Sequence, residues 1–189
     1  MDYSTCPPTA ELIHDLSLIK HPEGGYFAET DRQTEQIPSP FAGGEPRSLA
    51  TSIFYLLSSD SPNGFIHMNK SATMHVHHHG RAEYTLITPR ASPADPPKVE
   101  RVIVGPNAAA GEKRQLLVGT SVWKMSRLLQ EDIKTAEPAR LGCLITEVVF
   151  PGFHWEDHKY LTKEGLDGLF EGTEDADRWT KELSPYVKK

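Results

Sequence analysis

The pattern of hydrophobic and polar positions predicts one short helix followed by an all-β domain. Leu12, Ile13, Leu16 and Leu18 fall near helical spacing after Thr9, a residue able to cap a helix N-terminus, so we expect a helix over residues 9–18. Beyond it, β-rich runs recur at the roughly 8–12-residue spacing typical of a sandwich or barrel. Nine such runs cover residues 25–30, 49–58, 64–69, 73–79, 83–88, 99–104, 115–118, 122–128 and 141–150.

No helical crossover separates these runs, so an antiparallel sheet system is expected. The polar segment 131–140 is predicted to be a surface loop, and residues 174–183 a terminal helix with Trp179 on its buried side. We assign residues 9–172 to a barrel domain and 173–189 to a C-terminal helical tail.

Composition narrows the class of protein. The chain has 189 residues, of which 38% are hydrophobic and 24% charged, which is typical of one globular domain. Its net charge of −6 and scattered basic residues argue against a nucleic-acid partner. No apolar run approaches the ~20 residues of a membrane span. Two cysteines form no disulfide framework and no signal peptide is visible, so a cytoplasmic location is expected.

Histidines are concentrated in one stretch: five of the nine lie between His67 and His79. We interpret this stretch as a hairpin turning at residues 70–72, in which strand alternation puts His75, His77 and His79 on one face. His67 would then lie near the cross-strand partner of His75, close enough to share a metal ion or a proton. Periodicity leaves open whether this face points to the interior or to solvent.

Four segments carry a resemblance to a known family: HPEGGYF at residues 21–27, RSLATSIFYLL at 47–57, LVGTSVWKMSRL at 117–128 and VFPGF at 149–153. Together they resemble a small cupin subfamily catalogued as a domain of unknown function. The resemblance implies an all-β double-stranded β-helix, an RmlC-like jelly-roll barrel with short flanking helices, a homodimer, and a ligand site inside the barrel. It also implies that Thr73 and the histidines at 67, 75, 77 and 79 face the lumen.

The same resemblance implies that the superfamily's metal site is dismantled. Metal-binding cupins supply two histidines, a glutamate and a final histidine, and these positions fall here on Phe65, His67, Thr73 and Lys124. Only one of the four is a metal ligand.

Two chemistries suit a lumen of this composition. In the favoured one, no metal takes part and the catalytic residues are His67, His75, His77 and Lys124, which isomerise, epimerise or cyclise a carbonyl-bearing metabolite by acid–base steps. In the alternative, His67, His75 and His77 hold Fe, Ni, Cu or Zn in an oxygenase. A third interpretation is a metabolite-binding protein without turnover.

Other polar residues are weaker candidates. Those assigned to substrate binding are Tyr26, Glu29, Arg47, Thr73, His79 and Glu147, with a structural role open for Tyr26, Glu29 and Glu147 and an acidic side-chain partner open for Arg47. His154, Asp157 and His158 could bind zinc, but their spacing matches no closed site, so a surface strap is expected. His21 is expected to be structural, Cys143 to be buried in the core, and Cys6 to lie in a mobile end.

Overall fold

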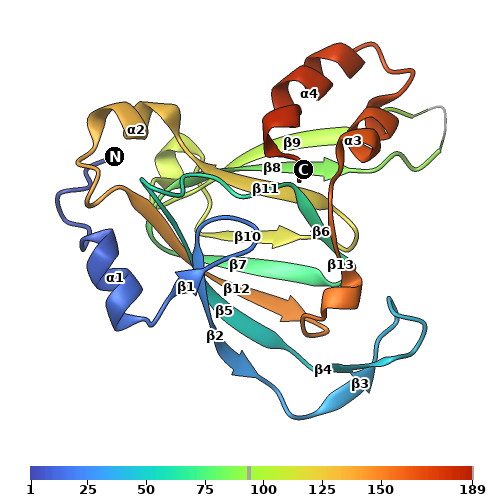
Figure 1. The fold of residues 1–189 in the computed structure, drawn as a ribbon, viewed down its shortest axis with the longest axis horizontal. Coiled ribbons are helices and arrows are strands. Elements are labelled where there is room, and N and C mark those ends of the chain that lie inside the picture. The colour runs from blue at the N-terminus through green and yellow to red at the C-terminus, as the bar shows by residue number, and fades with distance from the viewer. Residues whose placement is uncertain (93–94, 189) are drawn as a thin grey trace.

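Two antiparallel sheets face each other in the computed structural model, which describes residues 1–92 and 95–188 (Figure 1). One is a six-stranded sheet in the order β1-β2-β5-β12-β7-β10. Its strands are β1 (Ile19–Lys20), β2 (Tyr26–Arg32), β5 (Thr51–Ser58), β7 (Ala72–Gly80), β10 (Gln115–Val118) and β12 (Gly142–Phe150).

The opposite sheet has five strands in the order β13-β6-β11-β8-β9. They are β6 (His67–Asn69), β8 (Ala82–Thr88), β9 (Lys98–Val104), β11 (Trp123–Leu128) and β13 (His158–Tyr160). A separate ribbon pairs β3 (Gln36–Pro38) with β4 (Pro46–Ser48). The architecture is a jelly-roll sandwich, because strand pairing in the described residues does not close the two sheets into one hydrogen-bonded barrel.

All nine predicted strands are present, but the predicted hairpin is wrong. β6 pairs with β11 and β13, whereas β7 pairs with β12 and β10 in the other sheet. The chain therefore crosses from one sheet to the other at Lys70 and Ser71. His67 and His75 face each other across the sandwich and are not cross-strand neighbours.

The prediction that His79 faces the interior is wrong, because a β-bulge interrupts the pairing of β7 with β12. Along β7, Thr73, His75 and His77 pair with the inward-facing residues of β12, but the register then shifts so that His79 pairs with Leu144. Leu144 belongs to the cluster between the six-stranded sheet and the N-terminal helix, outside the sandwich. The extra residue of a bulge reverses strand alternation, and so His79 leaves the inner face.

Within the part of the chain that the structure describes, four α-helices lie outside the sheets: α1 (Thr9–Asp15), α2 (Gln130–Thr135), α3 (Lys163–Phe170) and α4 (Ala176–Leu183). Short 3-10 turns cover Ala108–Ala110, Trp155–Asp157 and Ser184–Tyr186. Helix α1 is shorter than predicted, and Thr9 does not cap it but donates its hydroxyl to the Ala139 carbonyl oxygen. Helix α2 occupies part of the predicted loop 131–140. No helix in the described residues is long and apolar enough to cross a membrane.

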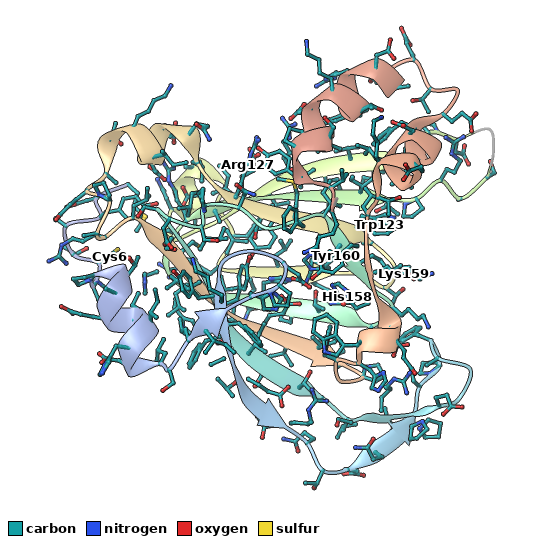
Figure 2. The ribbon with its side chains drawn as sticks, in the orientation of Figure 1. Cys6, Trp123, Arg127, His158, Lys159 and Tyr160 are labelled. Carbon is teal, nitrogen blue, oxygen red and sulfur yellow. The ribbon has the colours of Figure 1, made fainter. Side chains whose placement is uncertain are left out.

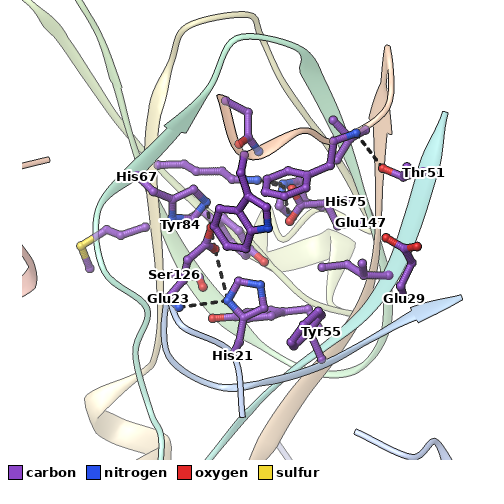
Figure 3. Close-up of a pocket in the computed structure, with 18 of the residues that line it drawn as sticks. His21, Glu23, Glu29, Thr51, Tyr55, His67, His75, Tyr84, Ser126 and Glu147 are labelled. Atoms are coloured by element: carbon purple, nitrogen blue, oxygen red, sulfur yellow. Dashed lines mark hydrogen bonds and ion pairs between the residues drawn. The ribbon is translucent and has the colours of Figure 1, made fainter. Parts of the chain in front are cut away.

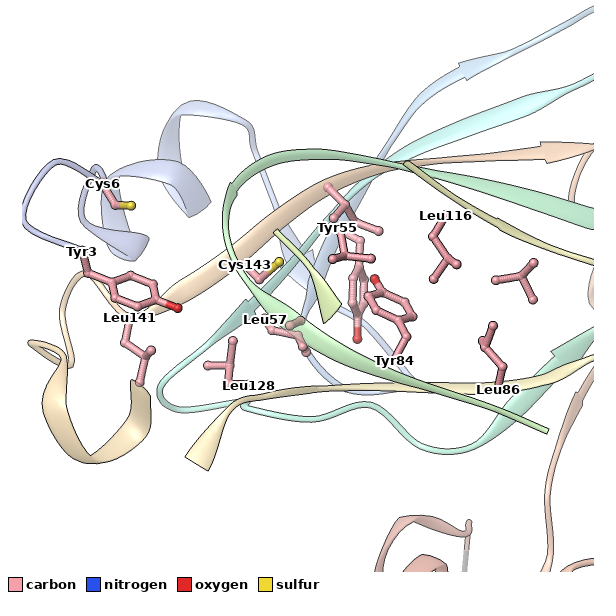
Figure 4. Close-up of a cluster of buried hydrophobic side chains, with 14 residues drawn as sticks. Tyr3, Cys6, Tyr55, Leu57, Tyr84, Leu86, Leu116, Leu128, Leu141 and Cys143 are labelled. Atoms are coloured by element: carbon pink, nitrogen blue, oxygen red, sulfur yellow. The ribbon is translucent and has the colours of Figure 1, made fainter. Parts of the chain in front are cut away.

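The core divides into an inner and an outer part. Between the sheets, Tyr55, Tyr84, Leu128 and Ile145 pack in one cluster (Figure 4). On the outer face of the five-stranded sheet, a second cluster joins residues of β8 and β11 to helices α3 and α4, including Ile87, Met125, Phe170 and Leu183. The predicted packing role of Trp179 is confirmed in this outer cluster, and Trp123 packs against the same cluster.

Both cysteines are free and buried. Cys143 lies in the inner cluster as predicted, whereas the expectation of a mobile end around Cys6 is wrong, since Cys6 and Tyr3 join the same cluster.

Candidate functional site

A cavity of about 170 Å³ opens between the sheets at one end of the sandwich (Figure 3). Apolar side chains form part of its wall, among them Phe27, Ile53, Val149, Phe153 and Trp155. Its charged and imidazole groups are His21, Glu23, Glu29, Arg32, His67, His75, Lys124 and Glu147. Strand alternation brings four of these groups inside, namely His67, His75, Lys124 and Glu147, which point inward from β6, β7, β11 and β12. Glu29 and Arg32 of β2 lie at the rim and are more exposed.

Lys124 crosses the gap between the sheets. It projects inward from β11, is 3% exposed, and its Nζ forms a short ion pair with Glu147 of β12. The same Nζ lies 3.2 Å from His75 Nε2 and 3.3 Å from Thr73 Oγ1, both on β7. A lysine ammonium has three donors, so these neighbours hold it in one place.

Charge partners and burial fix the protonation of this network. Burial acts to raise the pKa of Glu147, but the nearby Lys124 ammonium outweighs it, and the pKa falls to about 2. Burial lowers the pKa of His75 to about 3. At neutral pH Glu147 is therefore ionised and His75 neutral. The phenols of Tyr55 and Tyr84 have pKa values raised by burial and stay protonated.

A second polar group occupies the wall formed by β6 and β13. His67 and His158 stack with ring centroids 5.4 Å apart, and both present Nε2 to the buried carboxylate of Glu23. The His158 nitrogen lies 2.6 Å from Oε1 and the His67 nitrogen 3.2 Å from Oε2. Glu23 has a pKa below its usual range, because both imidazoles outweigh the opposing effect of burial. In the described residues, this trio is a group of ligand atoms within 4.8 Å of one another that could hold a metal ion.

The strap, residues 154–160, carries the buried His158 beside Lys159 and Tyr160 (Figure 2). A buried ion pair between Arg47 and Asp157 holds it in place. Arg47 places Nε 2.7 Å and Nη2 3.3 Å from the two carboxylate oxygens of Asp157. Lys70 reaches the same carboxylate at 3.1 Å and donates its backbone N–H to the Asp157 carbonyl oxygen. Bidentate pairs of this kind fix geometry, and so the strap positions the neighbouring His158.

The structure brings together part of the predicted site. His67, His75, Lys124 and Glu147 line the one cavity, and Glu29 reaches its rim, where it pairs with Arg32. Thr73 is buried behind the cavity in contact with Lys124 and His75.

Other predicted site residues lie elsewhere. His77 is farther along β7, with Nε2 2.7 Å from the Gly80 carbonyl oxygen. Tyr26 points to the outer face and donates its hydroxyl to Asp60 at 2.6 Å. Of the two partners open for Arg47, the structure shows the acidic side chain. His79 is turned away by the bulge described above.

Three residues of the cavity region were missed. His21 and Glu23 lie in the HPEGGYF segment, and His21 Nδ1 accepts the Glu23 backbone N–H at 3.0 Å. The expected surface role of the cluster at 154–158 holds for exposed His154 and is wrong for His158 and Asp157, which are buried. Two histidines and two acids at residues 154–158 were the available signal, but Glu23, the partner of His158, lies 135 positions away in the sequence.

The superfamily's metal-ligand positions do not fit a metal in this chain. Phe65 has no ligand atom, and its ring contacts Lys188, whose Nζ lies 4.8 Å from the ring centroid. Lys124 brings a positive charge to the final ligand position, within hydrogen-bond distance of Thr73 and His75. An ammonium group thus stands among the side chains at these positions, and its charge repels a metal cation.

Two facing sheets in jelly-roll order, with a polar cavity between them, define a cupin-fold protein. The chain belongs to the family described as Cupin superfamily (DUF985), whose model matches residues 10–161.

An uncharacterised protein of Saccharomyces cerevisiae, YML079W, is 39% identical over 168 residues, covering 84% of this chain and 78% of the yeast protein. A solved structure of a hypothetical protein from Leishmania major superposes with a TM-score of 0.79 at 24% identity, covering 97% of this chain and 100% of the other. Protein SO0799 from Shewanella oneidensis gives a TM-score of 0.74 at 21% identity, covering 96% and 98% of the two chains. These two structural similarities concern the fold alone.

Proposed function

We propose that this protein is an enzyme that moves a proton on a small carbonyl compound, an isomerisation or cyclisation that needs no metal. The observation that carries the proposal is the buried Lys124 network in the cavity wall, where a cation, a carboxylate and a neutral imidazole lie within 4 Å. A binding site without turnover has no need of a proton donor, a carboxylate and a neutral imidazole in mutual contact inside a cavity.

Each group has a role in the proposed step. Lys124 donates a hydrogen bond to the substrate carbonyl oxygen; it has a donor free for this when Thr73 satisfies His75 Nε2 at 3.2 Å. The C–H bond next to the carbonyl breaks, its proton passes to Glu147, and its electron pair moves to the carbonyl oxygen as an enolate. Glu147 Oε2 can accept that proton, since it lies 3.7 Å from His75 Nε2 and takes no hydrogen bond from the described residues.

Lys124 and Glu147 are coupled during this step. As the ammonium turns toward the developing enolate oxygen, it releases the carboxylate whose pKa it holds near 2. Glu147 then becomes a stronger base at the moment when the proton arrives. His75 receives the proton from Glu147. As the electron pair on the enolate oxygen moves back and re-forms the carbonyl, His75 returns the proton to the opposite face of the same carbon, or to the far carbon of a C=C bond conjugated with the enolate, which completes an epimerisation or an isomerisation.

Cavity size limits the substrate. The volume of about 170 Å³ is close to that of engineered cavities of ~150 Å³ that hold benzene. The reacting part of the substrate is therefore about the size of one six-membered ring. Larger substituents would pass the rim at Glu29, Arg32 and Trp155.

Solvent deuterium tests this function without knowledge of the substrate. We expect wild-type protein, incubated with a cell metabolite extract in D2O, to place deuterium on carbon in at least one metabolite, detected by mass spectrometry. Lys124→Met should abolish the labelling, and Lys159→Met, at an exposed lysine on β13, should leave it unchanged. A metabolite retained by the wild type without deuterium would support a binding protein instead, and labelling that survives Lys124→Met would overturn the mechanism.

A further inference from the structure

A second feature of the cavity wall, the Glu23–His67–His158 trio, has no part in the proton transfer proposed above. We propose that these three residues bind a divalent transition metal ion such as Zn²⁺. The site differs from the superfamily's metal position, because two of its three ligands come from the loop before β2 and from β13.

A hydrogen bond fixes the tautomer of His67. Its Nδ1 lies 2.9 Å from the Phe65 carbonyl oxygen, which can only accept, so Nδ1 carries a proton. In a neutral imidazole Nε2 then presents a lone pair, and this lone pair faces the Glu23 carboxylate at 3.2 Å. A metal ion there would take this nitrogen and the carboxylate oxygen as ligands. A backbone carbonyl that orients the other ring nitrogen is the usual arrangement around a metal-ligating histidine.

The separations between the ligand atoms of the trio also suit a metal ion. With metal–ligand bonds of about 2.0–2.2 Å, tetrahedral geometry puts neighbouring nitrogen and oxygen ligands roughly 3.3 Å apart. The His67 Nε2 to Glu23 Oε2 separation of 3.2 Å matches this value. The shorter 2.6 Å contact of His158 is a hydrogen bond carried by the Nε2 proton, and a bound cation would take the place of that proton.

Two strand neighbours of the trio have buried polar atoms without a hydrogen-bond partner in the described residues. In the described residues, Asn69 Oδ1 and Tyr160 Oη are buried with no hydrogen-bond partner. Asn69 lines the cavity and pairs with His158, while Tyr160 pairs with His67 across the same two strands. Buried polar groups are rarely left unpaired, and a ligand in the cavity would give Asn69 Oδ1 a partner.

The donor set defines the class of ion. Two imidazoles and one carboxylate form a three-ligand set that leaves further positions open, as in catalytic zinc sites, and nitrogen donors select transition metals over Mg²⁺ or Ca²⁺. The charge of the cavity agrees, because three carboxylates in its lining face only two permanently charged cations, Arg32 and Lys124. A divalent ion reverses that excess.

Calorimetric titration of untagged, chelator-stripped protein with Zn²⁺ tests the proposal. We expect one ion per chain, and at least 100-fold weaker binding in His158→Ala. The matched control, His154→Ala, removes an exposed histidine four positions away and should bind as the wild type does. Co²⁺ should give visible d–d absorption bands with the wild type and lose them in His158→Ala.

Glu23→Gln provides a second test if His158→Ala is shown by circular dichroism not to fold, because it keeps the shape of the side chain and removes the charged ligand. It too should bind Zn²⁺ at least 100-fold more weakly. Failure of the wild type to bind, or binding by both variants with wild-type affinity, would overturn the metal site. Since the readout is binding and not turnover, this failure would leave deuterium labelling intact, and loss of labelling would leave zinc binding intact.

Discussion

Replacing Lys124 by Met should lower the free energy of unfolding. It should also reverse the pH dependence of the contribution that Glu147 makes to this free energy. The substitution keeps a long side chain and removes the ammonium, which leaves the ionised Glu147 buried without its cation. Their side chains are 3% and 12% exposed. Removing one partner of a buried ion pair costs about 3–5 kcal/mol.

The expected loss can be measured by urea denaturation at pH 7. In a domain of this size each kcal/mol shifts the melting temperature by roughly 2–4 °C, so a thermal scan should show the same change. The double variant Lys124→Met/Glu147→Gln should recover most of the loss, because it removes the buried charge as well. This recovery separates the electrostatic cost from any change in packing.

The pH dependence follows from the pKa of Glu147. In the wild type this pKa is about 2, below the usual 4.5, so Glu147 contributes stability that is present above pH 4.5 and lost as the pH falls toward 2. Without Lys124, burial dominates and the pKa rises above 4.5. The variant is then most stable where Glu147 is protonated and loses stability as the pH rises.

The difference in unfolding free energy between wild type and Lys124→Met should therefore shrink as the pH is lowered from 7 to 4. Taking the difference cancels the titration of groups that the two proteins share. A loss below about 1 kcal/mol, or a difference that does not change with pH, would refute the assignment of Lys124 and Glu147 as a buried pair.

Three further outcomes test other parts of the structure. Leu56→Ala, at a fully buried position, should cost about 2–5 kcal/mol in urea denaturation, whereas Leu117→Ala, at a side chain 56% exposed, should stay within about 0.5 kcal/mol. Gly80→Ala should destabilise more than Gly111→Ala by the same measurement, because both have positive φ but only at Gly80 would a Cβ meet a carbonyl oxygen, at 1.8 Å. Tyr26→Phe should leave deuterium labelling at the wild-type level, because Tyr26 lies outside the cavity; a loss would contradict that placement.

Local pattern predicted the strands because alternation and turn residues are properties of the sequence itself. The partners of each strand are not, and this is why the hairpin prediction failed: the same run of residues is compatible with a turn within one sheet or a crossing to the other. The bulge in β7 is equally invisible, since it depends on the register against Leu144 and Ile145 of β12. One extra residue there moved His79 out of the site.

The candidate site was predictable where it follows from strand faces and not where it depends on contacts between distant segments. His75, Lys124 and Glu147 alternate inward on three long strands, so their convergence follows once the sheets stack. Glu23 and His158 come from short segments before β2 and at β13, and only the folded chain brings them to 2.6 Å. The spacing of zinc ligands along the sequence cannot reveal such a site, because its ligands are not neighbours in the sequence.

The two polar groups of the cavity differ in a way that assigns their chemistry. Lys124 is a covalently attached cation that no chelator can remove, whereas a metal on Glu23, His67 and His158 is exchangeable. Deuterium labelling that persists after chelation and disappears in Lys124→Met would place the reaction on the ammonium and give the metal a structural or orienting role. Labelling that requires Zn²⁺ and survives Lys124→Met would place it on the trio. Because the groups lie on different strands, each can be removed while the other stays in place.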